Sequence, residues 1–582
     1  MNTNPPSPLR HLARAMAAAA LLSVWSGLSA QTVPAQVLPS GMQVVNGQAS
    51  ATLSGATLTV RNSPDTILNW GSFSIGAQNA VRFEQNSAQS QVLNRVTGND
   101  PSAILGSLSS NGRVWLLNPN GVLFGAGARV DVAGLVVSTL NLNDADWLAG
   151  RYRFSGSAPA AVLNRGELRS SLGGRVVLLG GRVENQGDIS APGGQIVLAG
   201  GEQVELVDTG APNLSVRLGV AAAGAVLNAG RIEAAGGHID IHAASVNQQG
   251  IVRADALAQG PAGQIVLRAT DQLELGAASR TGAAGPDGGS VMLDGGANTR
   301  VSGALQAVGR TGQGGRLTLL GDTIDLRDGA ALDVSGASGG GQALIGGGAQ
   351  GRDPTLRNAS YLRLAPGARV SADALRSGDG GRIVLWSDLA TRAYGSLSAH
   401  GGLLGGAGGW IETSGGWLDV RLANLDLSAP AGRAGVWLLD PFNILITDQT
   451  QDSNVTTDFT ATGNDATISS ASLAAALNRG VQVVVSTAGS GSGNQAGDIS
   501  VTNANINVTS LSPGSLTLIA DRDIVFTNAH ISSFGSTAGV SGSLPVTLTA
   551  GRSGVGGVSI SNSTIFTSGG NLNIGGFGTG LG

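Results

Sequence analysis

Hydrophobic and polar residues alternate with a period of two in short segments along most of the chain, and many of these segments follow a pair of glycines. From about Gly173 onward the recurring phrase is two glycines, one polar residue and a short alternating segment. Copies begin at Gly173, Gly193, Gly236, Gly288, Gly314, Gly340, Gly380 and Gly408. The starts at 236, 288, 314 and 340 lie 52, 26 and 26 residues apart, and Ala262-Gly263 supplies the copy between the first two. The chain is therefore built on a sequence repeat.

This repeat predicts strands, because the alternation has period two and glycines interrupt it too often for helices. A repeat of this length with two or three short strands predicts an all-β fold, a right-handed parallel β-helix (β-solenoid). Successive coils would stack at ~4.8 Å and pair their backbones. The glycine pairs are expected to turn the corners, at positive φ and where no Cβ fits. A β-propeller is the alternative, although its repeats are ~40–45 residues long.

The composition narrows the function classes. Of the 582 residues, 92 are glycine, aromatic residues make up 4%, and all 34 basic residues are arginine. The interior is therefore expected to consist of Val, Ile, Leu and Ala. Cysteine is absent, which excludes a disulfide scaffold, a zinc ribbon, an iron–sulfur protein and a thiol enzyme. A formal net charge of −4 argues against a nucleic-acid partner.

The first thirty residues have the pattern of a secretory signal. Arg10, His11 and Arg14 precede an apolar run from Ala15 to Leu28, and small residues precede a cleavage site expected between Ala30 and Gln31. The run is shorter than the ~20 residues that span a bilayer. We expect a signal peptide at 1–30, read by the general secretion machinery, and a mature chain without a stable transmembrane segment.

The segment from about Gln31 to Phe154 contains nine short ordered motifs: Val60–Ser63, Leu68–Trp70, Phe73–Ile75, Val81–Phe83, Leu93–Gly98, Ile104–Gly106, Ser110–Gly112, Leu116–Gly125 and Val137–Leu140. With these motifs in this order, the segment resembles the secretion domain of two-partner-secreted exoproteins, the filamentous haemagglutinin and high-molecular-weight adhesin group. Downstream, Leu385–Asp388, Ile411–Gly415 and Trp437–Ile444 resemble the repeat region of the same group. The expected domains are a secretion domain at 31–165 that forms the cap and first coils, β-helix repeats at 166–446, and a Ser/Thr/Asn/Gly-rich continuation at 447–582.

The resemblance implies a dedicated outer-membrane β-barrel partner with periplasmic POTRA domains. The group's recognition and folding turn falls on Asn118, Pro119, Asn120 and Gly121, and Asn94 and Arg95 are further candidates for the same surface. Proline presets φ in a turn, and Asn-Gly supplies left-handed residues, so the four residues also fit a purely structural turn. The companion Asn-Pro-Asn-Leu motif of the haemagglutinin branch is absent.

Other candidate chemistry is weak. His238, Asp240 and His242 share one face of a strand and could ligate zinc, or could form the solvated face of a coil whose isoleucines point inward. Asp521-Arg522-Asp523 is the nearest approach to the carboxylate cluster of a polysaccharide-cleaving β-helix. The sequence therefore predicts no catalytic residue, no metal and no cofactor.

The function expected from these observations is that of a secreted or surface-exposed adhesin with a receptor on a host or neighbouring cell. Capture of haem or a haem carrier is the alternative, and a polysaccharide-cleaving enzyme is a further one. The chain ends inside a repeat phrase, Gly569–Gly576, without a polar cap, which predicts either a short protein or a piece of a larger exoprotein.

Overall fold

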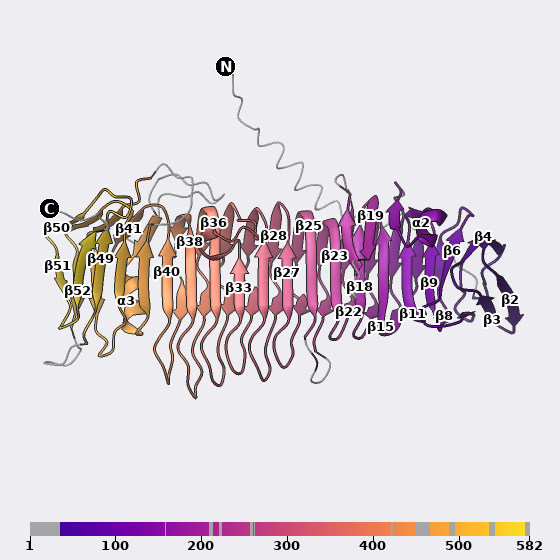
Figure 1. Cartoon of the computed structure of the whole chain (residues 1–582), viewed down its shortest axis with the longest axis horizontal. Helices are drawn as coiled ribbons and strands as arrows, with labels where there is room; N and C mark the ends of the chain where they lie inside the picture. Colours follow the sequence, from indigo (N-terminus) through magenta and orange to yellow (C-terminus); the bar gives the residue numbers. More distant parts are fainter. Residues whose placement is uncertain are drawn as a thin grey trace, which may run out of the picture.

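The computed structural model describes residues 35–576 except 158, 209–213, 220–223, 257–259, 261, 421–422, 449–465, 488–494 and 535–541. The expected signal peptide and its cleavage site at Ala30 and Gln31 lie outside the described residues. The rest is an elongated stack of strands, 45 of which join one continuous sheet (Figure 1). Nearly all neighbours in this sheet are parallel and come from successive coils, so the predicted parallel β-helix is confirmed.

The coil that begins at Ser290 shows the repeating unit. Its strands are β27 (Ser290–Asp294), β28 (Asn298–Val301) and β29 (Ala304–Gln306). Each pairs in parallel with its equivalent in the next coil, β30 (Arg316–Leu320), β31 (Thr323–Leu326) and β32 (Ala331–Asp333). We call the three stacked rows face A (β27, β30), face B (β28, β31) and face C (β29, β32). Ser290 pairs with Arg316 and Arg316 with Gln342, so a coil here takes the 26 residues of the sequence repeat.

The interior follows from the alternation within each strand. Val291, Leu293, Leu317 and Leu319 point inward and are fully buried, while the residues between them face outward. Aliphatic side chains fill the middle coils as predicted, but aromatic side chains contribute to the first coils. The largest of these are Trp70, Phe73, Phe83 and Phe124. Rings of this size bury more apolar surface than aliphatic side chains, and they therefore stabilise the first coils.

Antiparallel strands close the N-terminal end of the stack. Strand β1 (Gln43–Asn46) pairs antiparallel with β4 (Thr66–Trp70), and β2 (Ala49–Ser54) forms a hairpin with β3 (Thr57–Asn62). From β3 onward the main sheet is parallel, beginning with its pairing to β5 (Ala80–Glu84). These strands lie at the indigo end in Figure 1. The first parallel coil therefore builds on a cap from the same chain.

A small antiparallel sheet lies against face A of the early coils, which the repeat pattern did not predict. It contains β12 (Asn141–Leu142), β13 (Tyr152–Ser155), β19 (Gln203–Asp208) and β20 (Leu214–Leu218). The short helix α2 (Asp144–Leu148) connects β12 and β13. Trp115 of the coil packs edge-on against Trp147 of α2, with 6.1 Å between ring centroids, and stacks on Phe154 of β13. A second apolar cluster thus forms outside the coil interior.

A second departure is α3 (Ser470–Asn478), in the region where the sequence predicts only strands. Ser469 caps it by accepting a hydrogen bond from the backbone N–H of Ala471. Its sequence of alanines and leucines favours helix, and Leu473 and Leu477 are fully buried. Strands β43 (Gln482–Ser486) and β44 (Ile499–Thr502) then continue the stack.

The paired glycines were predicted to need positive φ, and this reason is wrong for most of them. Among the first members of the pairs, only Gly173, Gly193 and Gly236 have positive φ, and no second member has it. Glycine is required at these positions mainly because the backbone of the neighbouring coil leaves no room for a Cβ atom. A Cβ on Gly341 would lie 2.2 Å from the carbonyl oxygen of Gly315 in the previous coil, and one on Gly315 would lie 2.1 Å from that of Gly289.

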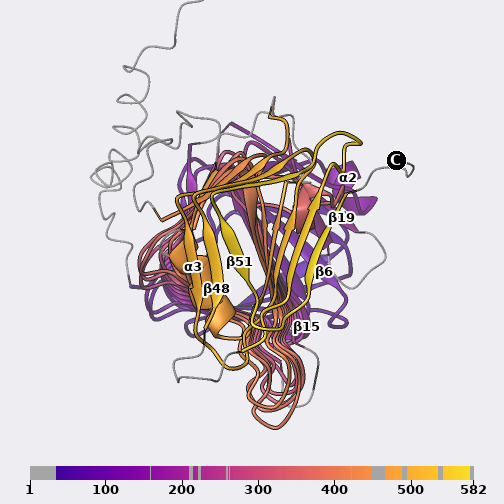
Figure 2. The same ribbon diagram turned by 90° about the vertical axis from the view of Figure 1, so that its left-hand side faces the viewer.

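The same glycines close the base of a row of projecting loops. We call loops 283–289, 307–315, 334–341, 372–381, 399–409 and 427–435, which join face C to face A, the loop stack. The N–H of Gly315 donates to the carbonyl of Ala307, 2.7 Å away, and that of Gly341 donates to Val334 at 2.7 Å. Each loop is thus pinched at its base. The stack projects along one edge of the rod in Figure 1 and below it in the end-on view of Figure 2.

Candidate functional site

The predicted recognition turn lies at the end of a buried strand. Asn118 is fully buried, and its side-chain amide donates to the carbonyl of Asp100 and to the hydroxyl of Ser102, both at 3.0 Å. Its side-chain oxygen accepts from the backbone N–H of Asn120 at 2.9 Å. Asn118 therefore joins two coils and sets the turn.

The rest of the turn is closer to solvent. Asn120 is exposed, and its amide donates to the carbonyl of Gly98 at 2.9 Å. Pro119 is half-buried. Gly121 has φ +117°, whereas Asn120 has an ordinary negative φ, so only one residue of the Asn-Gly pair is left-handed. Pro119 and Asn120 are the members of the motif that a partner could touch.

Asn94 supports the same coils from within, and Arg95 supports them from the outer side. Asn94 is fully buried, accepts a hydrogen bond from the indole of Trp70 at 2.9 Å and donates to the carbonyl of Trp115 at 3.1 Å. Arg95 donates to the carbonyl of Leu142 at 2.7 Å and pairs with Asp144 at 2.6 Å. It thereby ties α2 to the coil.

The histidine pair on strand β23 (His238–Gln248) is covered, which corrects the expectation of a solvated face. Ile239 and Ile241 do point inward, but Asp240 and His242 are each only 6% exposed. Strand β20 lies over them, because Gln195 donates both to the carbonyl of Leu214 at 2.8 Å and to Asp240 at 2.9 Å.

The three side chains form a close group in which His238 lies nearer to the carboxylate of Asp240 than His242 does. Asp240 lies 2.9 Å from Nε2 of His238 and 3.5 Å from Nε2 of His242. Burial would raise the pKa of Asp240, but the hydrogen bonds and charges of the two histidines outweigh it and hold that pKa well below its usual range. Within the part of the chain that the structure describes, no three His, Cys, Asp or Glu side chains are arranged to hold a metal ion.

The carboxylates at Asp521 and Asp523 are used in ion pairs. Arg522 donates through Nε to Asp498 at 2.8 Å and lies 3.2 Å from Asp523, while Asp521 lies 4.0 Å from Arg552. These contacts join successive coils. The arrangement thus resembles a surface ion-pair network.

Sequence reasoning missed a buried carboxyl pair on face A. Glu412 of β38 (Trp410–Asp419) and Asp440 of β40 (Val436–Asp440) are at most 1% exposed. The backbone N–H of Gln350 donates to Glu412 at 2.8 Å, and its side-chain amide donates to Asp440 at 2.8 Å. Burial raises the pKa of Glu412 to about 7 and that of Asp440 to about 6, although the hydrogen bonds from Gln350 lower both.

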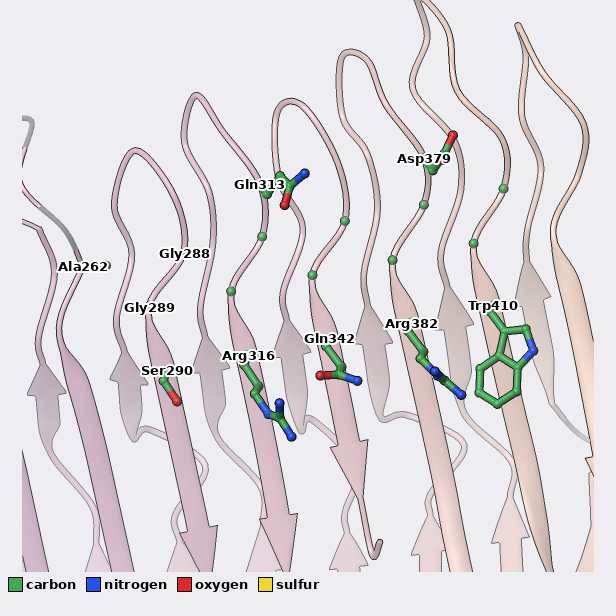
Figure 3. Close-up of a pocket in the computed structure, with 18 of the residues that line it drawn as sticks. Ala262, Gly288, Gly289, Ser290, Gln313, Arg316, Gln342, Asp379, Arg382 and Trp410 are labelled. Carbon is green, nitrogen blue, oxygen red and sulfur yellow. The ribbon is translucent and has the colours of Figure 1, made fainter. Parts of the chain in front are cut away.

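An open groove runs beside the loop stack and was also missed. Its volume is about 900 Å³, and the glycine pairs from Gly288 to Gly409 form its floor. Its wall is the first outward position of face A in seven successive coils: Gln264, Ser290, Arg316, Gln342, Arg382, Trp410 and Val436. Gln313 and Asp379 enter from the loops (Figure 3). The polar residue after each glycine pair was the available signal, because one repeat places all of them in one line.

Comparisons with known proteins agree with this architecture. The family model of the TPS secretion domain matches residues 35–255. The crystal structure of the HMW1 secretion domain from Haemophilus influenzae has a TM-score of 0.55 and 30% sequence identity, and covers 69% of this chain and 100% of that domain.

Two curated relatives are each named Heme/hemopexin-binding protein, both from Haemophilus influenzae. One is 42% identical over 123 residues, which is 21% of this chain, and the other is 38% identical over 99 residues, which is 17%. These matches span 13% and 11% of the relatives' own length.

A capped parallel β-helix whose residues 35–255 match a secretion-domain family model defines a β-helical exoprotein. The chain belongs to the two-partner-secretion exoproteins, the group of filamentous haemagglutinin and the HMW adhesins. Such exoproteins are secreted across the outer membrane to the cell surface or the medium. Family and fold match secretion-domain exoproteins. No helix among the described residues is both long and apolar enough to cross a membrane.

Proposed function

We propose that the chain is an adhesin, exported through a dedicated outer-membrane β-barrel with periplasmic POTRA domains. The observation that supports this best is the division of one solenoid into two kinds of surface. The first coils carry a cap and an extra antiparallel sheet and match the secretion domain. The later coils carry the loop stack and its open groove.

Export is driven by folding outside the cell. The outer membrane supplies no ATP, so each emerging coil must hold the chain by folding onto the coil before it. A coil such as 290–306 adds three parallel pairings and buries inward residues such as Val291, Leu293 and Leu305. Burial of apolar surface gives ~25 cal/mol per Å², and a coil meets only its neighbours. The coils then fold in the order in which they emerge.

The turn at Asn118–Gly121 takes part in recognition and folding. Asn118 performs the folding role because its buried side chain joins two coils. Pro119 and the exposed Asn120 form the part that the transporter reads, together with the nearby surface of Arg95.

Capture of haem or a haem carrier is the second candidate. It is favoured by the names of the two curated relatives and by 42% identity to one of them. We place it second because the match covers only 13% of that protein and 21% of this chain. Titration of the purified chain with haem, followed by absorbance, separates it from adhesion.

Expression with and without the transporter tests the export route. The chain should reach the medium or cell surface only when the transporter is present and should otherwise be recovered from the periplasm. Secretion that does not depend on any POTRA-containing barrel would contradict the proposal. Adherence of bacteria to host or neighbouring cells, with and without the chain, tests the adhesive role separately.

A further inference from the structure

A group of buried oxygen atoms lies on face A beneath the loop that carries Gln350. Glu412 and Ser414 are two residues apart on β38, so their side chains lie on the same side of the strand. Asp440 of β40 is the direct parallel partner of Ser414 (Figure 1). All three residues are at most 1% exposed. The stacking of two coils therefore brings two carboxyl groups and a hydroxyl together, away from solvent.

Each carboxyl group has one oxygen that is held and one that is not. Gln350 donates from its backbone N–H to Oε1 of Glu412 and from its side-chain amide to Oδ2 of Asp440, both at 2.8 Å. The other two oxygens, Oε2 of Glu412 and Oδ1 of Asp440, are buried without a hydrogen-bond partner among the described residues. Buried oxygens almost always have a partner, so these two point to a ligand that accepts their lone pairs.

Ser414 supplies a third buried oxygen at the same point. Its Oγ lies close enough to Glu412 to lower the pKa of that carboxyl, but it forms no hydrogen bond of acceptable geometry with any described residue. Ser414 lies between Trp386 of β36 (Arg382–Ala393) and Asp440 in one row of face A. A neutral side chain is thus left unsatisfied beside the two acids, which is evidence independent of their charge.

The two acids also lack a counter-charge. No Arg or His nitrogen of the described residues lies within 4.0 Å of either one, and Arg382 and Arg352 act on them only through charge at longer range. A buried carboxylate is costly unless it is paired with a cation or coordinates a metal ion. One divalent cation between the two acids would balance both charges and satisfy all three oxygens.

We propose that Glu412, Asp440 and Ser414 bind a calcium ion. All the donor atoms are oxygens, which hard cations prefer, and calcium accepts about six to eight of them in flexible geometry. Magnesium demands a near-ideal octahedron and usually keeps several waters, which suits a buried site less well. No three His, Cys, Asp or Glu side chains of the described residues are arranged around one ion, so neutral oxygens complete the set. Among them is the hydroxyl of Ser486, which lies beside Asp440.

Gln350 is a positioning residue for this site. Donors outside the coordination shell fix the orientation of ligating carboxylates, and Gln350 holds both of them. The loop that carries it is seated on Trp386, since a Cβ on Gly351 would lie 2.5 Å from that ring. A cation bound beneath the loop would join it to β38 and β40. The sequence pattern predicted no metal because it does not show that this loop covers Glu412 and Asp440.

Terbium luminescence and calorimetry on the purified full chain test the site at pH 8, after treatment with a chelator. Terbium occupies oxygen sites of the calcium type, and its emission is sensitised by a nearby indole, here that of Trp386. We expect saturable emission that calcium displaces at least about tenfold more effectively than magnesium. Titration with calcium alone should show about one ion per chain, with a Kd of roughly 10⁻⁶–10⁻³ M. Absence of saturable emission, or emission that calcium does not displace, overturns the proposal.

The variant Glu412→Gln/Asp440→Asn locates the site, since it keeps the shape of both side chains and removes both charges. Its affinity for calcium should fall by about a hundredfold or more. The matched control Asp521→Asn/Asp523→Asn removes two neighbouring carboxylates from the surface and should keep the affinity within about twofold. Equal loss in both variants, or none in the first, overturns the assignment.

The variant Ser414→Ala and thermal unfolding keep the test decisive if the double variant folds poorly. Ser414→Ala removes one neutral ligand and should weaken calcium binding by about three- to tenfold. Saturating calcium should raise the unfolding temperature of the original chain by about 2 °C or more at pH 8, and by less at pH 5, where protons compete for both carboxyl groups. Two acids that only share a proton would leave the unfolding temperature unchanged by calcium, and that result rejects the cation site. None of these measurements depends on cell adherence, so their failure is distinct from failure of the adhesive role.

Discussion

The side-chain amide of Asn185 donates a hydrogen bond of 2.8 Å to the side-chain oxygen of Asn228, its parallel partner one coil further along. The contact is part of a buried ladder on face B. Asn164 donates to Asn185 at 2.8 Å, and Asn228 donates to Gln248 at 2.6 Å. Each amide is both donor and acceptor, so the ladder satisfies buried polar groups across four coils while holding those coils in register.

Removing the middle of this ladder should weaken the coils on both sides of it. Asn185→Ala leaves the amide of Asn164 without its acceptor and the oxygen of Asn228 without its donor. The expected cost is about 2–4 kcal/mol in local stability, because buried orphaned groups keep their desolvation penalty. Hydrogen-exchange protection of β16 (Arg182–Asn185) and β21 (Ala225–Asn228) measures it. The control Leu172→Ala, at a side chain of β15 (Glu167–Gly180) that is 78% exposed, should change protection by about 0.5 kcal/mol or less. Unchanged protection in Asn185→Ala would show that the ladder does not stabilise the coils.

The close approach of paired glycines in successive coils predicts a large loss of stability when one methyl group is added. In Gly341→Ala the new Cβ would meet the backbone oxygen of Gly315 at 2.2 Å, and backbone cannot rotate aside as a side chain can. We expect a loss of about 2–4 kcal/mol and loosening of the loop stack. Gly557→Ala is the comparison, since no atom lies within 4 Å of that Cβ and φ is not positive. Thermal unfolding and protease cleavage in loop 334–341 report the difference, and equal stability of the two variants would refute the crowding argument.

The repeat could be predicted from sequence because it is local. The 26-residue spacing of the glycine pairs and the alternation after them depend on contacts between neighbouring coils, so one coil resembles the next. The positions of Val291 and Leu317 in the interior follow directly.

The other features were missed for two reasons. Some arise from contacts between residues far apart in the sequence, and one had a local signal that the surrounding strand pattern concealed. Strand β20 covers Asp240, and the hydrogen-bond donor to Glu412 is the backbone N–H of Gln350, 62 residues earlier. In sequence, Glu412 occupies an ordinary outward position of a strand. Only the insertion around Gln350, which closes over face A, makes it a buried acid. Helix α3 had a readable signal, the Ser469 cap followed by alanines and leucines, but the strand pattern around it concealed this.

The turn at Asn118 allows recognition and folding to be separated. We expect both Asn118→Ala and Asn120→Ala to reduce secretion and leave product in the periplasm, for different reasons. Asn118→Ala removes two buried hydrogen bonds between coils and should cost about 1–3 kcal/mol in stability. Asn120→Ala removes two side-chain hydrogen bonds, an exposed one to Gly98 and one to Asn118 Oδ1, which still accepts from the backbone N–H of residue 120. It should therefore leave stability nearly unchanged.

Secreted and periplasmic fractions, compared with urea denaturation of the purified chains, distinguish the two roles. Normal export of Asn120→Ala would mean that its side chain is not read by the transporter. Normal stability of Asn118→Ala would remove the folding role from that residue.

The buried carboxyl pair should make the cover over face A sensitive to pH. The pKa of Glu412 is about 7 and that of Asp440 about 6 in the folded chain, against ordinary values of 4.5 and 3.8. Because burial raises both, the folded state binds protons more tightly than the unfolded state. Stability is then fully present below about pH 4 and is lost as pH rises through 6 and 7. For Glu412 alone the loss is roughly 3 kcal/mol.

Hydrogen-exchange protection factors of residues 346–360, corrected for intrinsic exchange, test this between pH 5 and pH 8. Protection should fall as pH rises, since ionised Glu412 and Asp440 repel each other beneath the loop that carries Gln350. The variant Glu412→Gln/Asp440→Asn keeps the shape of both side chains but cannot ionise, so its protection should stay flat and exceed that of the original chain at pH 8. Glu233→Gln, at an outward position on face C, should keep the original pH dependence. A loop whose protection is the same at both pH values in the original chain would show that these acids do not control it.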